Sequence, residues 1–170
     1  MNSLNLYKKL EADLKHIGEV LCPAYGTMLG AVRDGKQIAW DKGLLDVMVI
    51  LGKPNEMERL NLILMYLYEK GYIVKVCKYR AFVSHPSTGK ARLDFQWAWY
   101  DNGEFGISFG WKYDRAKYKE GKYVDVKFEG VVMKVPDNAK EILKMIYGDW
   151  QNPDPDFKHT SIVNDINYWI

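Results

Sequence analysis

Apolar residues recur at helical spacing in two long segments of the chain. In residues 3–21 an apolar side chain returns every third or fourth position, which predicts a helix that ends before Pro23. Residues 55–70 show the same spacing and are followed by Gly71, a residue type that often closes helices. The pattern therefore predicts two amphipathic helices, each with one buried face.

Short apolar runs predict the strands. Residues 44–51, LLDVMVIL, form an apolar run with a single aspartate and predict a buried strand. Residues 91–100 predict a second such strand, which ends at the hairpin-like sequence Asp-Asn-Gly. Further strands are predicted in residues 72–83 and 104–135, and the clearest of them lies in residues 123–135.

Two shorter helices complete the pattern. Thr27 precedes a brief apolar-periodic run that Gly35 ends, so we predict a short helix with Thr27 as its N-cap. Pro136 opens a last helix that runs to Tyr147, and the Pro- and Asp-rich tail after it is expected to be irregular but packed. The order of elements predicts an α+β fold, with helices flanking a small mixed β-sheet. Because no linker divides the chain, residues 1–170 are expected to form one domain.

The overall charge is nearly balanced. The 24 basic and 22 acidic residues give a formal net charge of +2, which argues against nucleic acid as the main partner. Cys22 and Cys77 lie far apart, without the spacing of a metal site, and are expected to be reduced, buried thiols. No apolar run reaches transmembrane length and the N-terminus lacks a signal-peptide core, so we expect a cytoplasmic protein, acting alone or on a partner.

Two aspartates inside apolar strands are the main candidates for chemistry. Asp46 interrupts the run 44–51, and Asp94 interrupts the run 91–100. A charged carboxylate is costly in apolar surroundings unless it is paired or binds a metal. If the two strands are neighbours, both carboxylates can reach one Mg²⁺ ion, which neutralises charge on a transferred phosphoryl group. In the alternative, either aspartate faces solvent at a sheet edge or pairs with a lysine.

A glycine-threonine turn and an arginine form a candidate phosphate site. Backbone N–H groups of Gly26 and Thr27, at the start of the short helix, can contact a phosphate with the help of the helix N-terminus. Arg33 can add a bidentate phosphate contact. Gly-Thr also begins ordinary helices, and a lone arginine is often a surface residue, so these alternatives stay open.

The segment YGTMLGAVRDGKQIAWD, residues 25–41, resembles the signature of the LicD and fukutin-related family. In that family a G-[TS]-L-L-G-A-x-R segment runs into Trp-Asp and then into alternating aspartates on a strand. Four later segments also resemble the family, in its order: DVMV, RLDFQW, KFEGVVMKVP and IYGDWQNPDPDFKH. The resemblance covers residues 20–160.

The resemblance implies a nucleotidyltransferase-type fold and a metal-dependent phosphotransferase. Family members move a phospho-alcohol, such as phosphocholine, from a CDP-linked donor to a glycan acceptor. By this resemblance Gly26, Thr27 and Arg33 contact the donor phosphates. Asp46 and Asp94 ligate Mg²⁺ or Mn²⁺, and either can orient or deprotonate an acceptor hydroxyl.

The aspartate motif departs from the family pattern. The family has two aspartates spaced by one residue on the strand, whereas this chain has Leu44 before Leu45-Asp46, or an inserted residue after Asp41. In one reading, Asp41 reaches back through the flexible Gly43 and restores a second metal ligand at the catalytic site. In the other, metal binding is impaired, because Mg²⁺ demands near-ideal geometry. The missing pair favours impairment over rescue.

Three functions remain open at this point. The first is a LicD-type metal-dependent transferase. The second is a catalytically impaired homologue that acts as a nucleotide-binding, ligand-binding or scaffold protein. The third is nucleotide transfer to a small molecule or to an RNA end, of which the near-neutral charge disfavours RNA.

Overall fold

The computed structural model describes residues 3–41, 43–52, 56–77, 80–101, 103–107, 111–113 and 121–157. The elements in chain order are α1 (Ser3–Lys15), β1 (Cys22–Pro23), α2 (Tyr25–Arg33), β2 (Leu45–Leu51), α3 (Met57–Glu69), β3 (Ile73–Val76), β4 (Ala81–Ser84), the 3₁₀-helix η1 (Pro86–Thr88), β5 (Leu93–Asp101), β6 (Glu104–Ile107), β7 (Trp111–Tyr113), β8 (Tyr123–Phe128), β9 (Val131–Pro136) and α4 (Ala139–Tyr147). Within these residues, helices and strands alternate from α1 to β3, and strands predominate from there to β9.

The main sheet is mixed and is built around β2 and β5. In the described residues its seven strands follow the order β1-β2-β5-β4-β3, with β6 paired to β5 and β7 paired to β6. β2 and β5 run parallel, from Leu45 opposite Leu93 to Leu51 opposite Trp99. Every other pairing in this sheet is antiparallel. The predicted fold class, α+β with a small mixed sheet, is confirmed.

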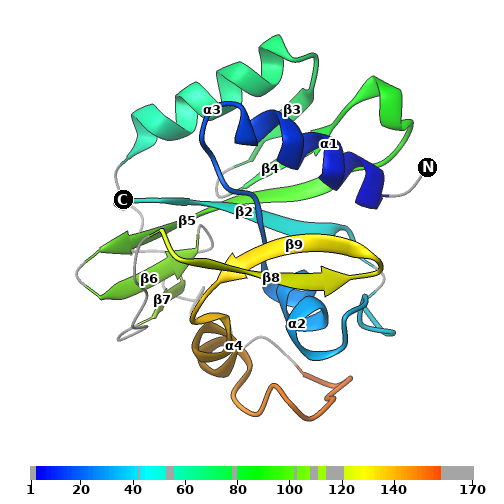
Figure 1. Ribbon diagram of the computed structural model, residues 1–170, viewed down its shortest axis with the longest axis vertical. Coiled ribbons are helices and arrows are strands. Elements are labelled where there is room, and N and C mark those ends of the chain that lie inside the picture. The colour runs from blue at the N-terminus through cyan, green and yellow to red at the C-terminus, as the bar shows by residue number, and fades with distance from the viewer. Residues whose placement is uncertain are drawn as a thin grey trace.

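Helices cover both faces of this sheet, with α1 and α3 on one side and α2 and α4 on the other (Figure 1). Alternate residues of β2 divide between the two cores. Val47 and Val49 pack with α1 and α3, whereas Met48 and Ile50 pack with α2 and α4. Burial on both faces explains why β2 is a continuous apolar run in the sequence.

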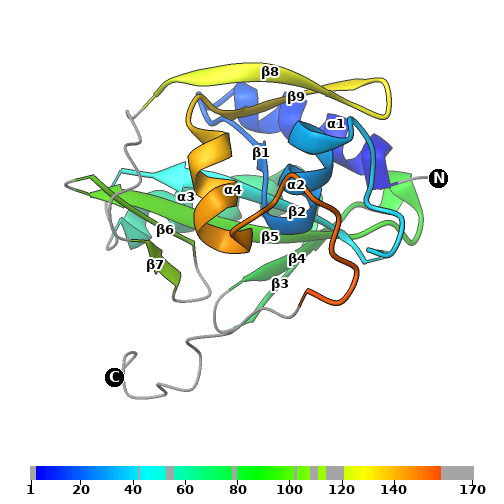
Figure 2. The same cartoon turned by 90° about the horizontal axis from the view of Figure 1, so that it is seen from below.

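A separate hairpin of β8 and β9 packs against β1 and α2 (Figure 2). Phe128 pairs with Val131 beside its turn. Glu129 in the turn adopts φ 48°, and its N–H donates to the Gly35 carbonyl oxygen at 2.8 Å. The hairpin therefore fixes the loop that follows α2.

Two predicted elements are shorter or more divided in the structure. α1 ends at Lys15 instead of reaching residue 21, because Gly18 takes φ 80° and turns the chain toward β1. The strand predicted over residues 72–83 is the hairpin of β3 and β4, in which the Cys77 N–H donates to the Arg80 carbonyl oxygen at 2.7 Å. A run of β-forming residues does not reveal such a turn, since no Gly or Pro marks it.

The last helix begins later than predicted. Pro136 ends β9, and α4 begins at Ala139. β2, α3 and β5 lie where the sequence predicts them, within two residues at each end. Of the predicted strand, turn and tail segments, residues 78–79, Asn102 and residues 108–110, 114–120 and 158–170 lie outside the described part of the chain.

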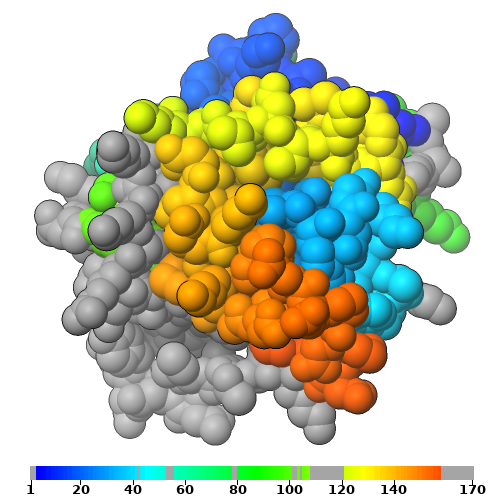
Figure 3. Space-filling view, turned by 60° about the horizontal axis from the view of Figure 1, so that its bottom comes forward, coloured from blue at the N-terminus to red at the C-terminus, as the bar shows by residue number. Residues whose placement is uncertain are grey.

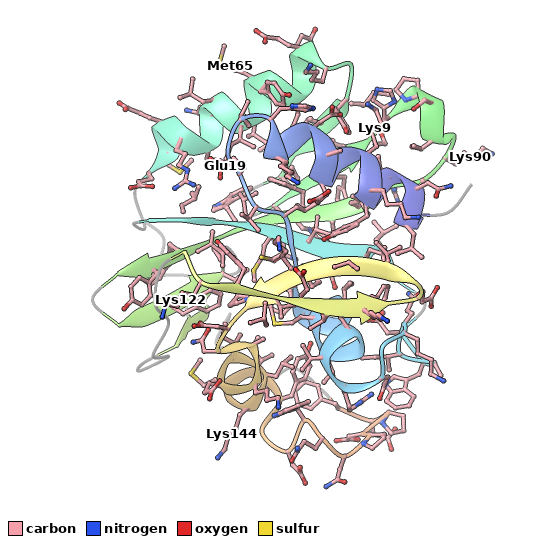
Figure 4. All side chains as sticks on the ribbon, in the orientation of Figure 1. Lys9, Glu19, Met65, Lys90, Lys122 and Lys144 are labelled. Atoms are coloured by element: carbon pink, nitrogen blue, oxygen red, sulfur yellow. The ribbon has the colours of Figure 1, made fainter. Side chains whose placement is uncertain are left out.

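The outer surface carries side chains that point away from the sheet. Figure 4 shows Met65 on the outer side of α3 and Lys144 on the outer side of α4. Cys22 and Cys77 are both free thiols; Cys22 is buried, as predicted, whereas Cys77 is partly exposed. Among the helices of the described ranges, none has the length and apolar character needed to cross a membrane.

Candidate active site

Asp46 and Asp94 lie side by side on the parallel strands β2 and β5. The register places them directly opposite each other, and adjacent strands lie about 4.8 Å apart. Asp46 shares its strand face with Met48, so it points to the side covered by α2 and α4. Both aspartates line one pocket with a volume of about 800 Å³. The neighbouring strands on which the metal hypothesis depends are therefore present.

The start of α2 is fastened to β2 beside this pair. The Ala24 N–H donates to the Asp46 carbonyl oxygen at 2.9 Å. Tyr25 adopts φ 39°, a left-handed conformation that a bulky residue takes only under constraint. A Cβ on the next residue, Gly26, would collide with Asp41 Oδ2. Gly26 is therefore required for the close approach of this turn to the Asp41 carboxylate.

Thr27 does not cap α2. It lies inside the helix, and the N-cap residue Ala24 makes no side-chain cap bond. The Thr27 hydroxyl oxygen instead accepts a hydrogen bond from the Asp46 N–H at 2.9 Å, and the residue is 4% exposed. The N-cap prediction is wrong because this hydroxyl satisfies a backbone donor of β2. Thr27 thus positions Asp46, and its contact with a donor phosphate stays a prediction.

Asp41 brings a third carboxylate to the pocket. Its Oδ1 accepts a hydrogen bond from the Gly43 N–H at 3.2 Å, and its Oδ2 lies beside Gly26. This placement favours the reading in which Asp41 reaches back past Gly43. Across the described ranges, however, no three His, Cys, Asp or Glu side chains form a group that could hold a metal ion. Asp41 therefore lies at the pocket wall without completing a three-residue metal cluster.

Burial and mutual repulsion dominate the electrostatics of the carboxylates. Burial, followed by the charges of Asp94 and Asp41, raises the pKa of Asp46 to about 8. Burial also raises the pKa of Asp94, and the adjacent guanidinium of Arg80 opposes that rise. The pKa of the Tyr147 hydroxyl is raised by burial and then by Asp46 and Asp41. The surroundings therefore disfavour the ionised form of these groups, Asp46 most clearly.

Arg80 is the cation that contacts Asp94. Its Nη1 donates to Asp94 Oδ2 at 2.6 Å, whereas Asp94 Oδ1 is buried and accepts no hydrogen bond from the described part of the chain. Arg80 directly precedes β4, and it lies two positions before Phe82, which pairs with Asp94. The sequence did not single out Arg80, because its place beside Asp94 depends on the pairing of β4 with β5.

Arg33 lines the pocket but is already engaged. Its Nε and Nη2 donate to the Asp34 carboxylate at 2.9 and 2.8 Å, and its Nη1 donates to the Trp150 carbonyl oxygen at 3.3 Å. Hydrogen bonds from Arg33 hold the pKa of Asp34 below its ordinary value. Arg33 therefore ties α2 to the tail, and the predicted phosphate contact would require it to leave Asp34.

The tail after α4 forms one wall of the pocket. In Figure 3 its orange surface adjoins the blue surface of α2 and the following loop. Tyr147 contacts Phe157, with ring centroids 5.0 Å apart. The tail is irregular, as predicted, but residues 151–156 are exposed, so close packing is limited to contacts such as this one. The tail residues that line the pocket were not predicted as site residues: Asp149, Trp150, Asn152, Pro153, Asp154, Pro155 and Phe157.

Gln96 is a further pocket residue that was not predicted. It lies two positions after Asp94, on the same face of β5, and is 1% exposed. Its Oε1 is buried without a hydrogen-bond partner, which is costly unless a ligand or water supplies a donor. The sequence signal that could have identified Gln96 is its spacing of two residues from Asp94, which places both side chains on one face of the strand.

The donor set around Asp46 fits a hard divalent cation. Mg²⁺ and Mn²⁺ prefer carboxylate oxygens. Asp94 Oδ1 is buried with no partner among the described residues, and burial together with the neighbouring negative charges raises the pKa of Asp46. A positive ion between the two carboxylates would give Asp94 Oδ1 a partner and would favour the ionised form of Asp46.

The fold and the pocket place the chain among nucleotidyltransferase-fold proteins. It is similar to a crystal structure of ANT(2″)-Ia, an aminoglycoside nucleotidyltransferase, in complex with adenylyl-2″-tobramycin. That likeness has a TM-score of 0.52 and 17% identity, and covers 91% of this chain and 80% of the other. It is also similar to a solution structure of the antibiotic-resistance factor ANT(2″)-Ia, with a TM-score of 0.49 and 18% identity, covering 91% and 75% of the two chains. No protein-family profile and no curated protein matches the sequence.

The assignment to the LicD and fukutin-related family is wrong. The similar solved structures belong to a different nucleotidyltransferase family, and no family profile supports the resemblance. The matching residues have structural roles in this chain. Gly26 permits the close approach of the Asp41 carboxylate, the Thr27 hydroxyl links α2 to β2, and Asp46 lies on a central strand. Because these roles are structural in this chain, the matching motif does not by itself identify a family.

Proposed function

We propose that the chain is a metal-dependent nucleotidyltransferase that moves a nucleoside monophosphate from a nucleoside triphosphate to a hydroxyl group of a small polar acceptor. The observation that carries this proposal is the pairing of Asp46 and Asp94 in one pocket with the start of α2. The nucleotidyltransferase fold supports it further. The CDP-linked donor and the glycan acceptor lose their basis with the LicD assignment. Use of a nucleoside triphosphate suits the expected cytoplasmic location.

Each part of the pocket has a role in this reaction. Asp46 and Asp94 would hold Mg²⁺ or Mn²⁺, which supplies positive charge against the donor phosphates when bound. The first turn of α2, at Gly26, would direct backbone N–H groups toward a phosphate. The Asp94 carboxylate oxygen that does not ligate the ion would accept the proton of the acceptor hydroxyl. The hydroxyl oxygen then bonds to the α-phosphorus, and pyrophosphate leaves.

The outer part of the pocket favours a cationic acceptor. Asp149 and Asp154 add two carboxylates to the wall formed by the tail, and Trp40 and Trp150 add aromatic surface. Carboxylates pair with ammonium groups, and aromatic faces attract cations. The solved ANT(2″)-Ia structure holds an adenylylated tobramycin, so we propose an amino sugar or a comparable cationic polyol as acceptor for this chain.

The direct test combines purified protein with Mg²⁺, each of the four nucleoside triphosphates, and tobramycin or an uncharged sugar alcohol. We expect pyrophosphate release and a nucleotidylated cationic acceptor, detected by mass spectrometry. The Asp94→Asn variant should lose turnover by about 100-fold or more, whereas the exposed Asp156→Asn variant should keep it. Absence of any nucleotide adduct with the natural protein, under all metal and donor conditions, would overturn the proposal.

A second candidate is a catalytically impaired nucleotide-binding protein. It is favoured by Leu44, which stands two positions before Asp46 where a second strand carboxylate would share its face. It is also favoured by the lack of a three-residue metal group in the described residues. Metal-dependent turnover gained only in a Leu44→Asp variant would support this candidate. Robust turnover by the natural protein would eliminate it.

A further inference from the structure

Among the described residues, the guanidinium of Arg80 is the positive group that forms an ion pair with the Asp46–Asp94 site. Arg80 Nη1 lies 2.6 Å from Asp94 Oδ2, and no described cation forms an ion pair with Asp46. Arg80 also lines the pocket, and its side chain is 37% exposed. The positive group therefore lies at the open side of the site, in contact with a carboxylate that is only 5% exposed.

The surroundings of Arg80 hold it without enclosing it. Its guanidinium carbon lies 4.9 Å from the centre of the Phe82 ring, a contact that orients the side chain along β4. The pairing of Phe82 with Asp94 keeps this ring beside the carboxylate. Partial exposure leaves room for the guanidinium to change its partner while the ring still supports it.

A cation and Arg80 compete for the same carboxylate. Asp94 is buried, and an unpaired buried charge is strongly unfavourable, so Arg80 has a stabilising role as long as no other positive charge is present. Once Asp94 and Asp46 ligate a divalent ion, this need disappears and the guanidinium is repelled. Phosphate oxygens are the acceptors that suit a planar guanidinium best.

We propose that Arg80 is an exchangeable counter-ion, which neutralises Asp94 in the metal-free protein and contacts the triphosphate of the donor when Asp94 ligates a divalent cation. This inference rests on the proposed function. Arg80 thus links the filling of the metal site to donor binding: the metal frees the guanidinium, and the donor gives it a new partner. The Arg80 guanidinium therefore stays in the pocket both before and after the metal and the donor bind.

The test measures two affinities in the full chain. Mn²⁺ binding without nucleotide is followed by electron paramagnetic resonance, and binding of a non-hydrolysable ATP analogue at saturating Mn²⁺ is followed by calorimetry. In Arg80→Gln we expect Mn²⁺ to bind about tenfold more tightly, because a competing cation is removed. The ATP analogue should bind about tenfold more weakly, because a charge-assisted contact is lost.

Arg92→Gln is the matched control. Arg92 approaches the same Phe82 ring, at 5.4 Å, but it is exposed and does not line the pocket. Both affinities should stay within about twofold of the natural protein. If Arg80→Gln does not fold, Arg80→Lys decides: Mn²⁺ affinity should stay unchanged, and the ATP analogue should bind more weakly because the bidentate contact is lost.

The outcomes separate this inference from the proposed function. Weaker Mn²⁺ binding in Arg80→Gln, or unchanged affinity for the ATP analogue in the Arg80 variants, overturns the counter-ion role alone. Failure of the natural protein to bind either Mn²⁺ or any nucleoside triphosphate analogue overturns both. Opposite changes of the two affinities support the exchange, because a merely structural arginine would weaken both.

Discussion

Replacing Asp46 with asparagine is expected to stabilise the metal-free protein. Burial and the charges of Asp94 and Asp41 raise the pKa of Asp46 to about 8, compared with about 3.9 in an unfolded chain. Between these two pH values the folded protein holds a proton that the unfolded chain lacks. The free energy of unfolding therefore falls as pH rises through this range. Asparagine keeps the shape of the side chain and removes this titration.

The magnitude follows from the pKa difference. Each pKa unit corresponds to about 1.4 kcal/mol. The part of the shift between the unfolded pKa and pH 7 would therefore lower the free energy of unfolding of the natural protein by about 4 kcal/mol at pH 7. Structural relaxation and water penetration reduce the penalty of a pocket-facing carboxylate. We therefore expect Asp46→Asn to raise the free energy of unfolding by about 2 kcal/mol at pH 7, by almost nothing near pH 4, and by its full amount above pH 8.

Urea unfolding with EDTA present, repeated from pH 4 to pH 9, measures this difference. Asp156→Asn is the control, because Asp156 is exposed in the tail and does not line the pocket. It should follow the natural protein at every pH. A stability gain in Asp46→Asn that does not depend on pH, or a loss of stability at pH 7, would refute the reasoning that burial and neighbouring charge hold this carboxyl protonated.

Three other predictions concern residues around Asp46. Gly26→Ala should lower turnover about tenfold or more with little change in the urea midpoint, because the new Cβ displaces the flexible end of Asp41 and disturbs the site geometry. Thr27→Val should lower the free energy of unfolding by about 1–3 kcal/mol in a urea titration, because the Asp46 N–H loses its acceptor. Gln96→Leu should leave the urea midpoint unchanged or raise it, since a buried oxygen without a partner is removed, while KM for donor or acceptor rises in steady-state kinetics.

Each of these predictions has a clear contrary result. Full turnover in Gly26→Ala would show that the close approach to Asp41 is not needed. Thr27→Ser retains the hydroxyl and should behave nearly as the natural protein, so equal losses in both variants would point to packing instead. A large loss of stability in Gln96→Leu would show that its amide has a structural partner.

The strands of the site could be predicted because burial leaves a strong pattern. β2 is buried on both faces, so its apolar run and its one aspartate were visible in the sequence. The parallel pairing of β2 with β5 could not be read from either strand alone. It depends on the crossover through α3, β3 and β4, and it alone brings Asp46 opposite Asp94.

Residues that act through tertiary contacts escaped prediction. The sequence around Thr27 predicted a helix N-cap, yet the Thr27 hydroxyl in α2 accepts a hydrogen bond from the Asp46 N–H in β2. Arg80 reaches Asp94 only because β4 pairs with β5. The tail carries no periodic pattern, so its place along the pocket wall follows from contacts such as that between Arg33 and Trp150. The expectation of one domain over residues 1–170 stays a prediction.

Whether Asp46 and Asp94 hold a divalent cation for nucleotide transfer is tested most directly by crystals grown with Mn²⁺ and a non-hydrolysable ATP analogue. Anomalous scattering then locates the manganese without ambiguity. We predict a peak at a ligand distance of about 2.1 Å from a carboxylate oxygen of each aspartate, with the donor phosphates on its other side. A bound nucleotide with no manganese at these carboxylates, or manganese held elsewhere, would contradict the proposed site.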